Sequence, residues 1–244
     1  MIRVAATGDL HFGPDLAGTV RPHLEDLAEH ADVLLIAGDV TRVGDPEEAR
    51  ELAKELAGLE VPVIAVLGNH DYHSDRQAEV ADILEVEGIR VLEGEATTLE
   101  IDGSSLGVVG AKGFGGGFVG ASGSDFGEPE MKAFIRHTRE IAERLGRALS
   151  DLASEHRVAL LHYAPIEATL LGERPEIYPF LGSYLLGEAI DGAGADLILH
   201  GHAHRGTERG VTPGGIPVRN VARPVIQRAY NVYCLGAGGG VSGE

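Results

Sequence analysis

The sequence has little of several residue types, and each shortage excludes a class of protein. The only cysteine, Cys234, excludes an internal disulfide, and its place in the apolar run YNVYCLG predicts a small core residue and not a nucleophile. No apolar run reaches the roughly 18 residues that a transmembrane helix needs. The N-terminal residues form a strand pattern and not a basic, cleavable leader, so we expect a cytoplasmic protein without a membrane segment.

Basic residues are also scarce. The chain has 20 Lys and Arg against 38 Asp and Glu, which gives a formal net charge of −18. Binding along duplex nucleic acid needs clustered Lys and Arg, so we expect no broad duplex-binding surface. An acidic chain can still bind one phosphate group through metal ions, because bound cations reverse the local field.

The 244 residues, of which 43% are hydrophobic and 24% charged, have the balance of an ordinary globular chain with a sizeable core. We expect a single domain over residues 1–235 and a flexible glycine-rich tail over 236–244. The segment 111–130 is rich in glycine and contains Phe114, Phe118 and Phe126. Long internal loops are usually functional or disordered. We expect this loop to be mobile over the substrate, with its phenylalanines either on an organic group or pinned to the core.

Strand patterns and helix patterns alternate in the first half of the chain. Short apolar runs begin at residues 3, 33 and 61, and helical patterns cover 15–30, 46–59 and 75–87. Pro22 is expected to divide the first of these helical patterns. Asp45 and Pro46 suit the cap and the first position of the second helix. The alternation predicts a mainly parallel sheet with helices outside it. The strands between 89 and 110 are predicted to be antiparallel, and further helices are predicted at 129–155 and 183–193.

Several apolar strands end in Asp, Asn or His. In chain order these residues are Asp9, His11, Asp39, Asn69, His70, Asp71, His162, His202 and His204. Each group taken singly has a plain structural explanation, such as a turn or a helix cap. Taken together they indicate one location, because ligands of open α/β sheets bind at the carboxyl ends of the strands.

The stretch LILHGHAH shows how two of these histidines can converge. His202 and His204 are two residues apart, and an extended chain places such residues on one face. Gly201 would allow the backbone to turn after the strand. His200 belongs to the apolar run, so we expect it in the core or behind the site.

The chemistry of the set favours metal binding. Asp, Asn and His supply oxygen and nitrogen ligands that suit Mn, Fe, Zn or Ni, and no thiolate is present among them. Seven such groups are too many for one ion, whereas two ions that share one carboxylate would each receive four protein ligands. Two such ions form a clamp for in-line displacement at phosphorus.

The ordered blocks D-x-H, G-D, G-N-H-D, a lone His and G-H-x-H, from Asp9 to His204, resemble those of the calcineurin-like binuclear metallophosphoesterase superfamily. The resemblance implies an α/β fold built as a four-layer α/β/β/α sandwich of two mixed β-sheets. It also implies two divalent transition-metal ions, for which we expect Mn, with Fe, Zn or Ni as alternatives. A hydroxide that bridges the two ions would attack phosphorus.

The resemblance assigns a role to each residue. One metal would be held by Asp9, His11, Asp39 and His204. The second metal would be held by Asp39 as the bridge, Asn69, His162 and His202. His70 would be the unligated catalytic histidine, which contacts the phosphoryl group or protonates the leaving oxygen. Related phosphatases have a carboxylate three residues after the aspartate of the G-D block, where this chain has Arg42, so the partner that orients His70 is open between Asp71 and Asp45.

The motif variants favour a phosphodiester substrate. GDVTRVG, GNHD and the compact GHAH look more like the blocks of cyclic-nucleotide and other diesterases than those of protein phosphatases. Only Arg42 and Arg205 lie near the blocks, so few cations are available for the second charge of a monoester. We therefore expect a small phosphodiester, such as a cyclic nucleotide. The alternatives are a phosphomonoesterase, a nuclease with the same site, or a non-catalytic scaffold, which would be expected to have lost ligands.

Overall fold

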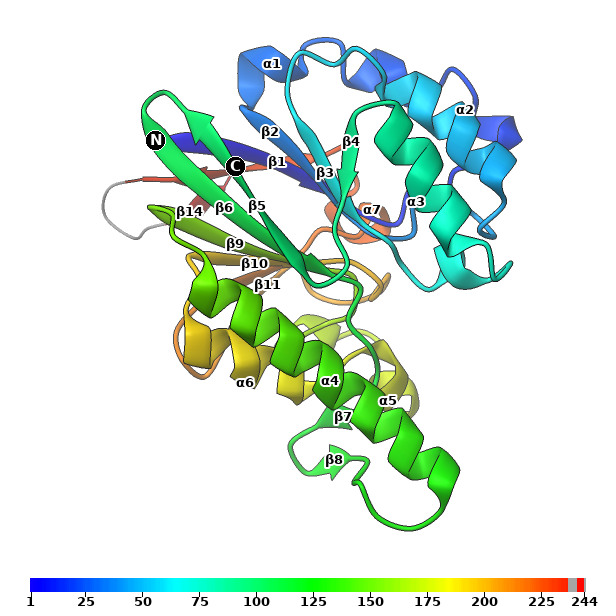
Figure 1. Ribbon diagram of the computed structural model, residues 1–244, viewed down its shortest axis with the longest axis vertical. Helices are drawn as coiled ribbons and strands as arrows, with labels where there is room; N and C mark the ends of the chain where they lie inside the picture. The colour runs from blue at the N-terminus through cyan, green and yellow to red at the C-terminus, as the bar shows by residue number, and fades with distance from the viewer. Residues whose placement is uncertain (237–240, 244) are drawn as a thin grey trace.

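Two six-stranded β-sheets pack face to face between layers of helices in the computed structural model, which describes residues 1–236 and 241–243 (Figure 1). This arrangement confirms the predicted four-layer α/β/β/α sandwich. Among the described residues, no helix combines the length and the apolar character that a membrane span requires.

The first sheet has the strand order β14-β13-β1-β2-β3-β4. Its strands are β1 (Ile2–Thr7), β2 (Val33–Ala37), β3 (Val63–Val66), β4 (Ile89–Val91), β13 (Asn231–Leu235) and β14 (Val241–Gly243). Strands β1 to β4 are parallel, as the alternating pattern predicts. Cys234 is half-buried in β13. Of the expected tail over 236–244, residues 241–243 pair with β13, and residues 237–240 and 244 lie outside the described residues.

The second sheet has the strand order β11-β12-β10-β9-β6-β5. Its strands are β5 (Glu95–Ile101), β6 (Ser104–Ala111), β9 (His156–Leu161), β10 (Leu197–His200), β11 (Arg209–Val211) and β12 (Pro217–Asn220). The four inner strands are parallel, and β5 and β11 are antiparallel edges. The predicted antiparallel pairing over 89–110 is confirmed for β5 and β6. It is wrong for β4, which returns through a helix to lie parallel to β3.

Helices cover the outer face of each sheet. The described α-helices are α1 (Leu27–His30), α2 (Pro46–Leu56), α3 (Gln77–Val86), α4 (Pro129–Asp151), α5 (Tyr178–Leu181), α6 (Tyr184–Ala193) and α7 (Arg223–Ile226). Helices α1 to α3 pack on the first sheet, and α4 and α6 pack on the second. The Asp45 carboxylate accepts a hydrogen bond of 3.0 Å from the Glu47 N–H, which confirms the predicted cap of α2.

The helical pattern over 15–30 is divided, as was expected from Pro22, but most of it is not α-helical. The segment instead forms two 3-10 helices, η1 (Pro14–Leu16) and η2 (Arg21–His23), followed by α1. Gly18 has a φ of +78°, which a right-handed helix does not allow, and Pro22 has no N–H to continue a helical ladder. The apolar spacing of the segment is used for packing on the first sheet, but without one continuous helix.

The core has one layer between the sheets and one on the outer side of each sheet. In β2, Leu34 and Ile36 face the helices, and Val33, Leu35 and Ala37 face the other sheet. Both faces of the inner strands are therefore buried, which explains their continuous apolar runs. Because these runs end at the surface, the first polar residues after them lie at the edge of the sandwich.

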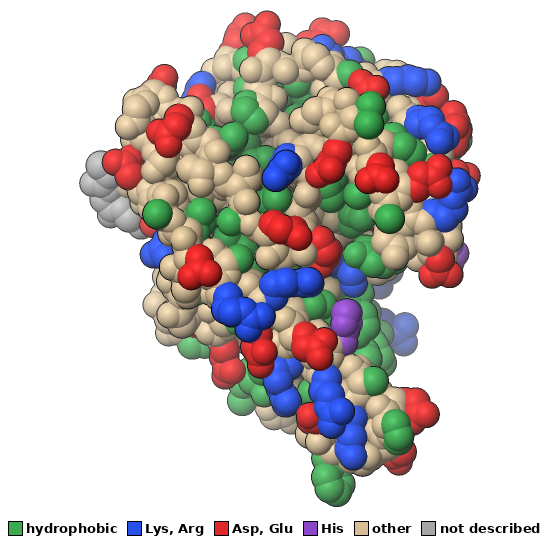
Figure 2. Space-filling view, in the orientation of Figure 1, with side chains coloured by type: hydrophobic (Ala, Val, Ile, Leu, Met, Phe, Trp, Pro, Cys, Tyr) green, Lys and Arg blue, Asp and Glu red, His purple; other side chains and the backbone are tan. Residues whose placement is uncertain are grey.

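The charged surface is mixed (Figure 2). Around α4, Arg136 and Arg139 both contact Asp125, at 3.1 and 3.2 Å, and Arg147 lies 3.9 Å from Glu143. Red and blue side chains are interspersed over the face that Figure 2 shows. Figure 2 shows blue side chains gathered along α4 with red ones beside them, and these three arginines lie close to neighbouring carboxylates.

Candidate metal centre

The predicted site residues converge at one edge of the sandwich. Their loops follow β1, β2 and β3 of the first sheet and β9 and β10 of the second. Three overlapping sets have ligand atoms within 4.8 Å of one another and could hold metal ions: Asp9, His11 and His204; His11, Asp39 and His70; and Asp39, His162 and His202. The Asn69 side-chain oxygen lies 3.0 Å from His162 Nε2. The structure thus brings together all seven predicted ligands and His70.

The backbone is strained at four of these residues. Asp9, His11, Asp39 and His202 have φ values of +56°, +43°, +48° and +69°. This left-handed region costs non-glycine residues of order 1 kcal/mol each, and such strain clusters at functional sites. Parallel loops hold the geometry, because Asp9 N–H donates to the Gly38 carbonyl and His11 N–H to the Asp39 carbonyl, each at 2.9 Å.

Glycines in the motif blocks allow the loops to approach closely. Gly38 has a φ of +81°, and a Cβ atom there would lie 2.6 Å from His162 Nδ1. A Cβ atom on Gly201 would collide with the Asp9 carboxylate. Gly201 was expected to let the backbone turn after β10 without a Cβ clash, and the group that a Cβ would meet there is the Asp9 carboxylate.

Asp9 organises the first set of side chains. Its buried carboxylate lies 2.8 Å from His204 Nε2 and accepts the His202 N–H at 3.0 Å. The Nε2 atoms of His11 and His204 are 3.3 Å apart. One carboxylate of the first sheet is therefore joined to the loop that follows β10 of the second.

In the set that contains Asp39 and His162, several hydrogen-bond acceptor atoms lie close together. His162 Nδ1–H donates to the Ala37 carbonyl at 2.8 Å, because a carbonyl can only accept, so the lone pair is on Nε2. This Nε2 lies 3.4 Å from Asp39 Oδ1 and 3.0 Å from Asn69 Oδ1. Three acceptors at these distances repel one another unless a cation or a proton lies among them. A main-chain partner behind a histidine is also the usual support of a metal ligand.

His202 is oriented in the same way. Its Nε2–H donates to the Phe180 carbonyl at 3.2 Å, which leaves the lone pair on Nδ1. Its ring packs on the ring of Tyr163, with 4.4 Å between the centroids. His202 is therefore held between α5 and the loop after β9, with one ring nitrogen available as a ligand.

Burial keeps most of the imidazoles neutral, which is the form that binds metals. It lowers the pKa values of His11 and His162 to about 4 and that of His202 well below its usual value. Burial also raises the pKa of Asp39, whereas the hydrogen bond with Asp9 raises the pKa of His204. Two buried carboxylates surrounded mainly by neutral rings have a charge that a divalent cation would neutralise. The donor set therefore fits Mn, Fe, Zn or Ni.

His70 is supported by the main chain. Its Nδ1–H donates to the Arg42 carbonyl at 2.7 Å, and its Nε2 lies 4.0 Å from Asp39 Oδ2. Its ring lies against that of His11, with 4.4 Å between the centroids. Neither expected partner orients it, because Asp45 caps α2 and Asp71 points elsewhere. Residue 42 is Arg in this chain, and it supplies its main-chain carbonyl oxygen to His70, which no side-chain pattern could predict.

Asp71 joins two loops of the site. Its buried carboxylate accepts hydrogen bonds from the N–H groups of Gly68, Thr41 and Val40 at 2.7, 2.8 and 3.2 Å. The Thr41 hydroxyl adds a fourth, at 2.5 Å. Burial raises the pKa of Asp71 to about 6. The G-N-H-D block thus ends in a residue that fixes the positions of Asn69 and His70.

His200 lies in the core, as expected. It is fully buried, and its Nε2 lies 2.8 Å from the Thr169 hydroxyl. Its Nδ1–H donates to the Gly201 carbonyl at 2.8 Å, and burial lowers its pKa to about 4. Of the three alternating histidines, the first therefore supports the turn and the other two face the cluster.

The segment 111–130 is partly packed. It contains the short strands β7 (Gly117–Phe118) and β8 (Ala121–Ser122). Phe118 is buried beside Leu181, and Phe114 packs on Tyr163, whereas Phe126 is 81% exposed. Two of the phenylalanines thus pin the segment to the fold, and its mobility stays a prediction. Sequence reasoning missed a different exposed aromatic, Phe180 at 62%, whose carbonyl bonds to His202.

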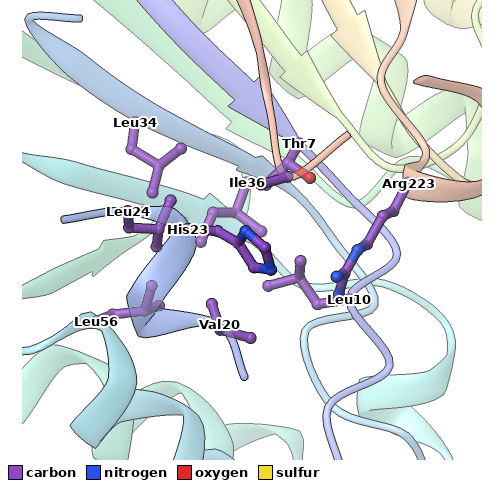
Figure 3. A pocket seen from close by; sticks show the side chains of 10 residues that line it. Thr7, Leu10, Val20, His23, Leu24, Leu34, Ile36, Leu56 and Arg223 are labelled. Carbon is purple, nitrogen blue, oxygen red and sulfur yellow. The ribbon is translucent and has the colours of Figure 1, made fainter. Parts of the chain in front are cut away.

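The cavity in Figure 3 lies outside the site, on the helix side of the first sheet. Its walls are largely apolar, with His23 and Arg223 beside it, and its volume is about 20 Å³. That is room for about one water molecule. The buried Thr7 hydroxyl at its wall has no hydrogen-bond partner within the described part of the chain. The cavity therefore suits a single structural water and not a substrate.

The two-sheet fold and this edge of carboxylates and histidines agree with the expected metallophosphoesterase fold. The family model described as calcineurin-like phosphoesterase matches residues 2–206, so the chain belongs to that family. Members of this family use divalent metal ions, and the clusters at this edge could bind them.

Solved structures show the same fold. The phosphopantetheinyl hydrolase PptH of Mycobacterium tuberculosis has 17% identity and a TM-score of 0.64, with 90% of this chain and 88% of that chain covered. TT1561 of Thermus thermophilus has 16% identity and a TM-score of 0.59, with coverage of 100% and 98%. GAP50, described as the anchor in the inner membrane complex of Plasmodium, has 10% identity and a TM-score of 0.54, with coverage of 95% and 80%. No curated protein sequence matched the chain.

Replacing Asp71 by Asn should destabilise the protein. The amide nitrogen of Asn would face the N–H and O–H donors that now bond to the carboxylate, and the charge-assisted hydrogen bonds would be lost. We expect the free energy of unfolding to fall by about 2–3 kcal/mol. For a chain of this size we expect the melting temperature to fall by roughly 4–12 °C. Thermal unfolding measures the effect, and Asp75→Asn is the control, because Asp75 is exposed on the same loop. Equal melting temperatures for Asp71→Asn and the control would contradict the role of Asp71.

Replacing Asp39 by Ala should reduce metal binding. Asp39 belongs to two of the three sets, so its loss removes a ligand shared between them. We expect the wild-type protein, loaded with Mn and desalted, to retain two ions per chain by elemental analysis and the variant to retain clearly fewer. Asp45→Ala is the control, since that residue caps α2. Two retained ions in Asp39→Ala would show that Asp39 is not the bridge.

Proposed function

We propose that the protein is a phosphoric ester hydrolase that depends on two divalent metal ions. The observation that carries the proposal is the convergence of Asp9, His11, Asp39, Asn69, His162, His202 and His204 at one edge, with ligand atoms within 4.8 Å in overlapping sets of His and Asp side chains. Asp39 is common to two sets, as a bridging carboxylate would be. A scaffold without catalysis would not need this complete set, or the strain of its backbone.

When bound, two divalent cations would supply positive charge to the phosphoryl oxygens and lower the pKa of water. In the overall reaction water adds to phosphorus, the ester P–O bond breaks, and the leaving oxygen takes up a proton. Protonated His70 can supply that proton. Its Nδ1–H stays on the Arg42 carbonyl, and its Nε2–H faces the cluster beside Asp39.

Phosphodiesters are the proposed substrate class. A diester has one negative charge, whereas a monoester dianion gains from further cationic side chains. The Arg42 guanidinium lies 2.6 Å from Asp15, and Arg205 is exposed, so neither is held by the cluster. Phe180, whose carbonyl accepts from His202, is 62% exposed, and its ring offers an apolar surface for an organic leaving group such as a nucleoside. A small diester, cyclic nucleotides included, suits these features, and phosphomonoesters and nucleic-acid ends are the alternatives.

His70→Ala should keep both metal ions and lose turnover. One positioned acid or donor contributes roughly 10²–10⁴-fold, so we expect kcat to fall by that factor. Elemental analysis and kcat are measured on the same preparation. His73→Ala is the matched control, because His73 is exposed three residues further along the same turn. A lost metal ion in His70→Ala would instead make His70 a ligand, which its place in one of the three sets allows.

Ester preference is measured with the Mn-loaded protein on bis(p-nitrophenyl) phosphate and p-nitrophenyl phosphate. We expect kcat/KM to favour the diester, and a chelator to abolish both activities. A tenfold preference for the monoester, ~1.4 kcal/mol in transition-state free energy, would replace the diesterase proposal by a phosphomonoesterase. The absence of both activities in a protein that retains two metal ions would contradict the proposed function itself.

A further inference from the structure

A buried lysine lies next to the metal centre. The chain has three lysines, Lys54, Lys112 and Lys132. Lys112 follows β6 directly and is only 7% exposed. Lysines are almost never this buried unless they are paired with an opposite charge. Lys112 therefore calls for a reason other than surface solubility.

Three aromatic rings surround the Lys112 ammonium. Its Nζ lies 4.8 Å from the ring centroid of Tyr72, 4.9 Å from that of Phe114 and 5.2 Å from that of Tyr163. Its hydrogen-bond partner within the described residues is the Gly113 carbonyl, at a long 3.4 Å. Rings stabilise a cation through their faces but accept no ordinary hydrogen bond. An ammonium has three donors, so most of its capacity is left for a ligand.

The same elements hold the metal cluster. The Lys112 carbonyl accepts the N–H groups of His162 and Tyr163, at 3.1 and 3.0 Å. The Tyr163 ring packs on His202, and Tyr72 belongs to the 3-10 helix η3 (His70–Tyr72), which starts at His70. Lys112 is thus fixed to the cluster through its own main chain and through the rings around its ammonium.

The charges near Lys112 leave its ammonium unpaired at close range. Burial lowers its pKa, and the nearby carboxylates of Glu93 and Asp39 oppose that shift. Glu93 accepts the Lys112 backbone N–H at 3.3 Å and the Tyr72 hydroxyl at 3.5 Å. In the described part of the chain, no carboxylate oxygen lies within 4.0 Å of Nζ. The Glu93 carboxylate therefore stabilises the ammonium by long-range electrostatic attraction and does not form a salt bridge with it.

We propose that Lys112 is a specificity-determining residue whose ammonium binds an anionic oxygen of the phosphoryl group. The inference rests on the proposed phosphoesterase function. A monoester dianion and inorganic phosphate have more negative charge than a diester, so they gain more from a cation at this place. Because Arg42 and Arg205 are not held by the cluster, the monoester activity that accompanies the preferred diester activity depends on Lys112, while the metal ions and His70 serve both ester classes.

The test compares Lys112→Met with Lys112→Arg and with Lys54→Met, an exposed lysine on α2. Methionine keeps the length and apolar stem of lysine and removes the charge. We expect Lys112→Met to retain both metal ions and to lose at least tenfold in kcat/KM on p-nitrophenyl phosphate. The loss on bis(p-nitrophenyl) phosphate should be less than threefold. Lys112→Arg should recover part of the monoester activity, and Lys54→Met should match the wild type.

Calorimetric titration of the Mn-loaded proteins with inorganic phosphate gives a readout that needs no turnover. We expect about tenfold weaker binding to Lys112→Met than to the wild type or Lys54→Met. Equal losses on both esters, or unchanged phosphate binding, would overturn the proposal and leave Lys112 with a structural role beside Glu93. If the wild type hydrolyses neither ester, the proposed function fails, while phosphate binding still decides whether Lys112 binds the anion.

Discussion

The buried carboxylate of Asp39 is the group on which the geometry of the site depends. It accepts the His70 N–H at 2.8 Å, and it lies 3.4 Å from His162 Nε2 and 3.7 Å from His11 Nε2. These partners come from the loops after β1, β3 and β9, so one charge connects both sheets. A buried charge is costly unless it is compensated, and neutral imidazoles compensate it poorly. A cation among these groups turns the same arrangement from a cost into a stabilising interaction, which is why the donor set favours metal binding.

This dependence explains where the fold accepts strain. Asp9, His11 and Asp39 hold left-handed backbone conformations, and Gly38 and Gly201 are there because any Cβ would enter the space of the site. The three core layers stabilise the sandwich independently of this edge. At many functional sites, local backbone strain is compensated by the stability of the well-packed core.

The sequence was informative where the signal is local or periodic. Continuous apolar runs followed by Asp, Asn or His placed the site at the strand ends, and Asp45 before Pro46 predicted a cap that the structure confirms. Pro22 predicted a division of the helical pattern over 15–30, but the apolar spacing did not show that most of this segment would form 3-10 turns. The acceptor of His70 is a main-chain carbonyl, and the rings around Lys112 come from three separate segments. Contacts of these two kinds depend on the tertiary fold and leave no pattern in the sequence.

The overall charge and the local charges of the site together favour a small substrate. A chain with a net charge of −18 repels anions at long range, but salt screens such repulsion beyond roughly 8 Å at physiological ionic strength. Within that distance the bound cations and the Lys112 ammonium would reverse the sign of the field at one phosphoryl group. A long polyanion has many further phosphates outside this region, and they would meet the acidic surface without compensation. A single phosphate ester with a compact organic group has no such additional phosphates. The charge distribution of the protein therefore favours a small phosphoester and disfavours duplex nucleic acid.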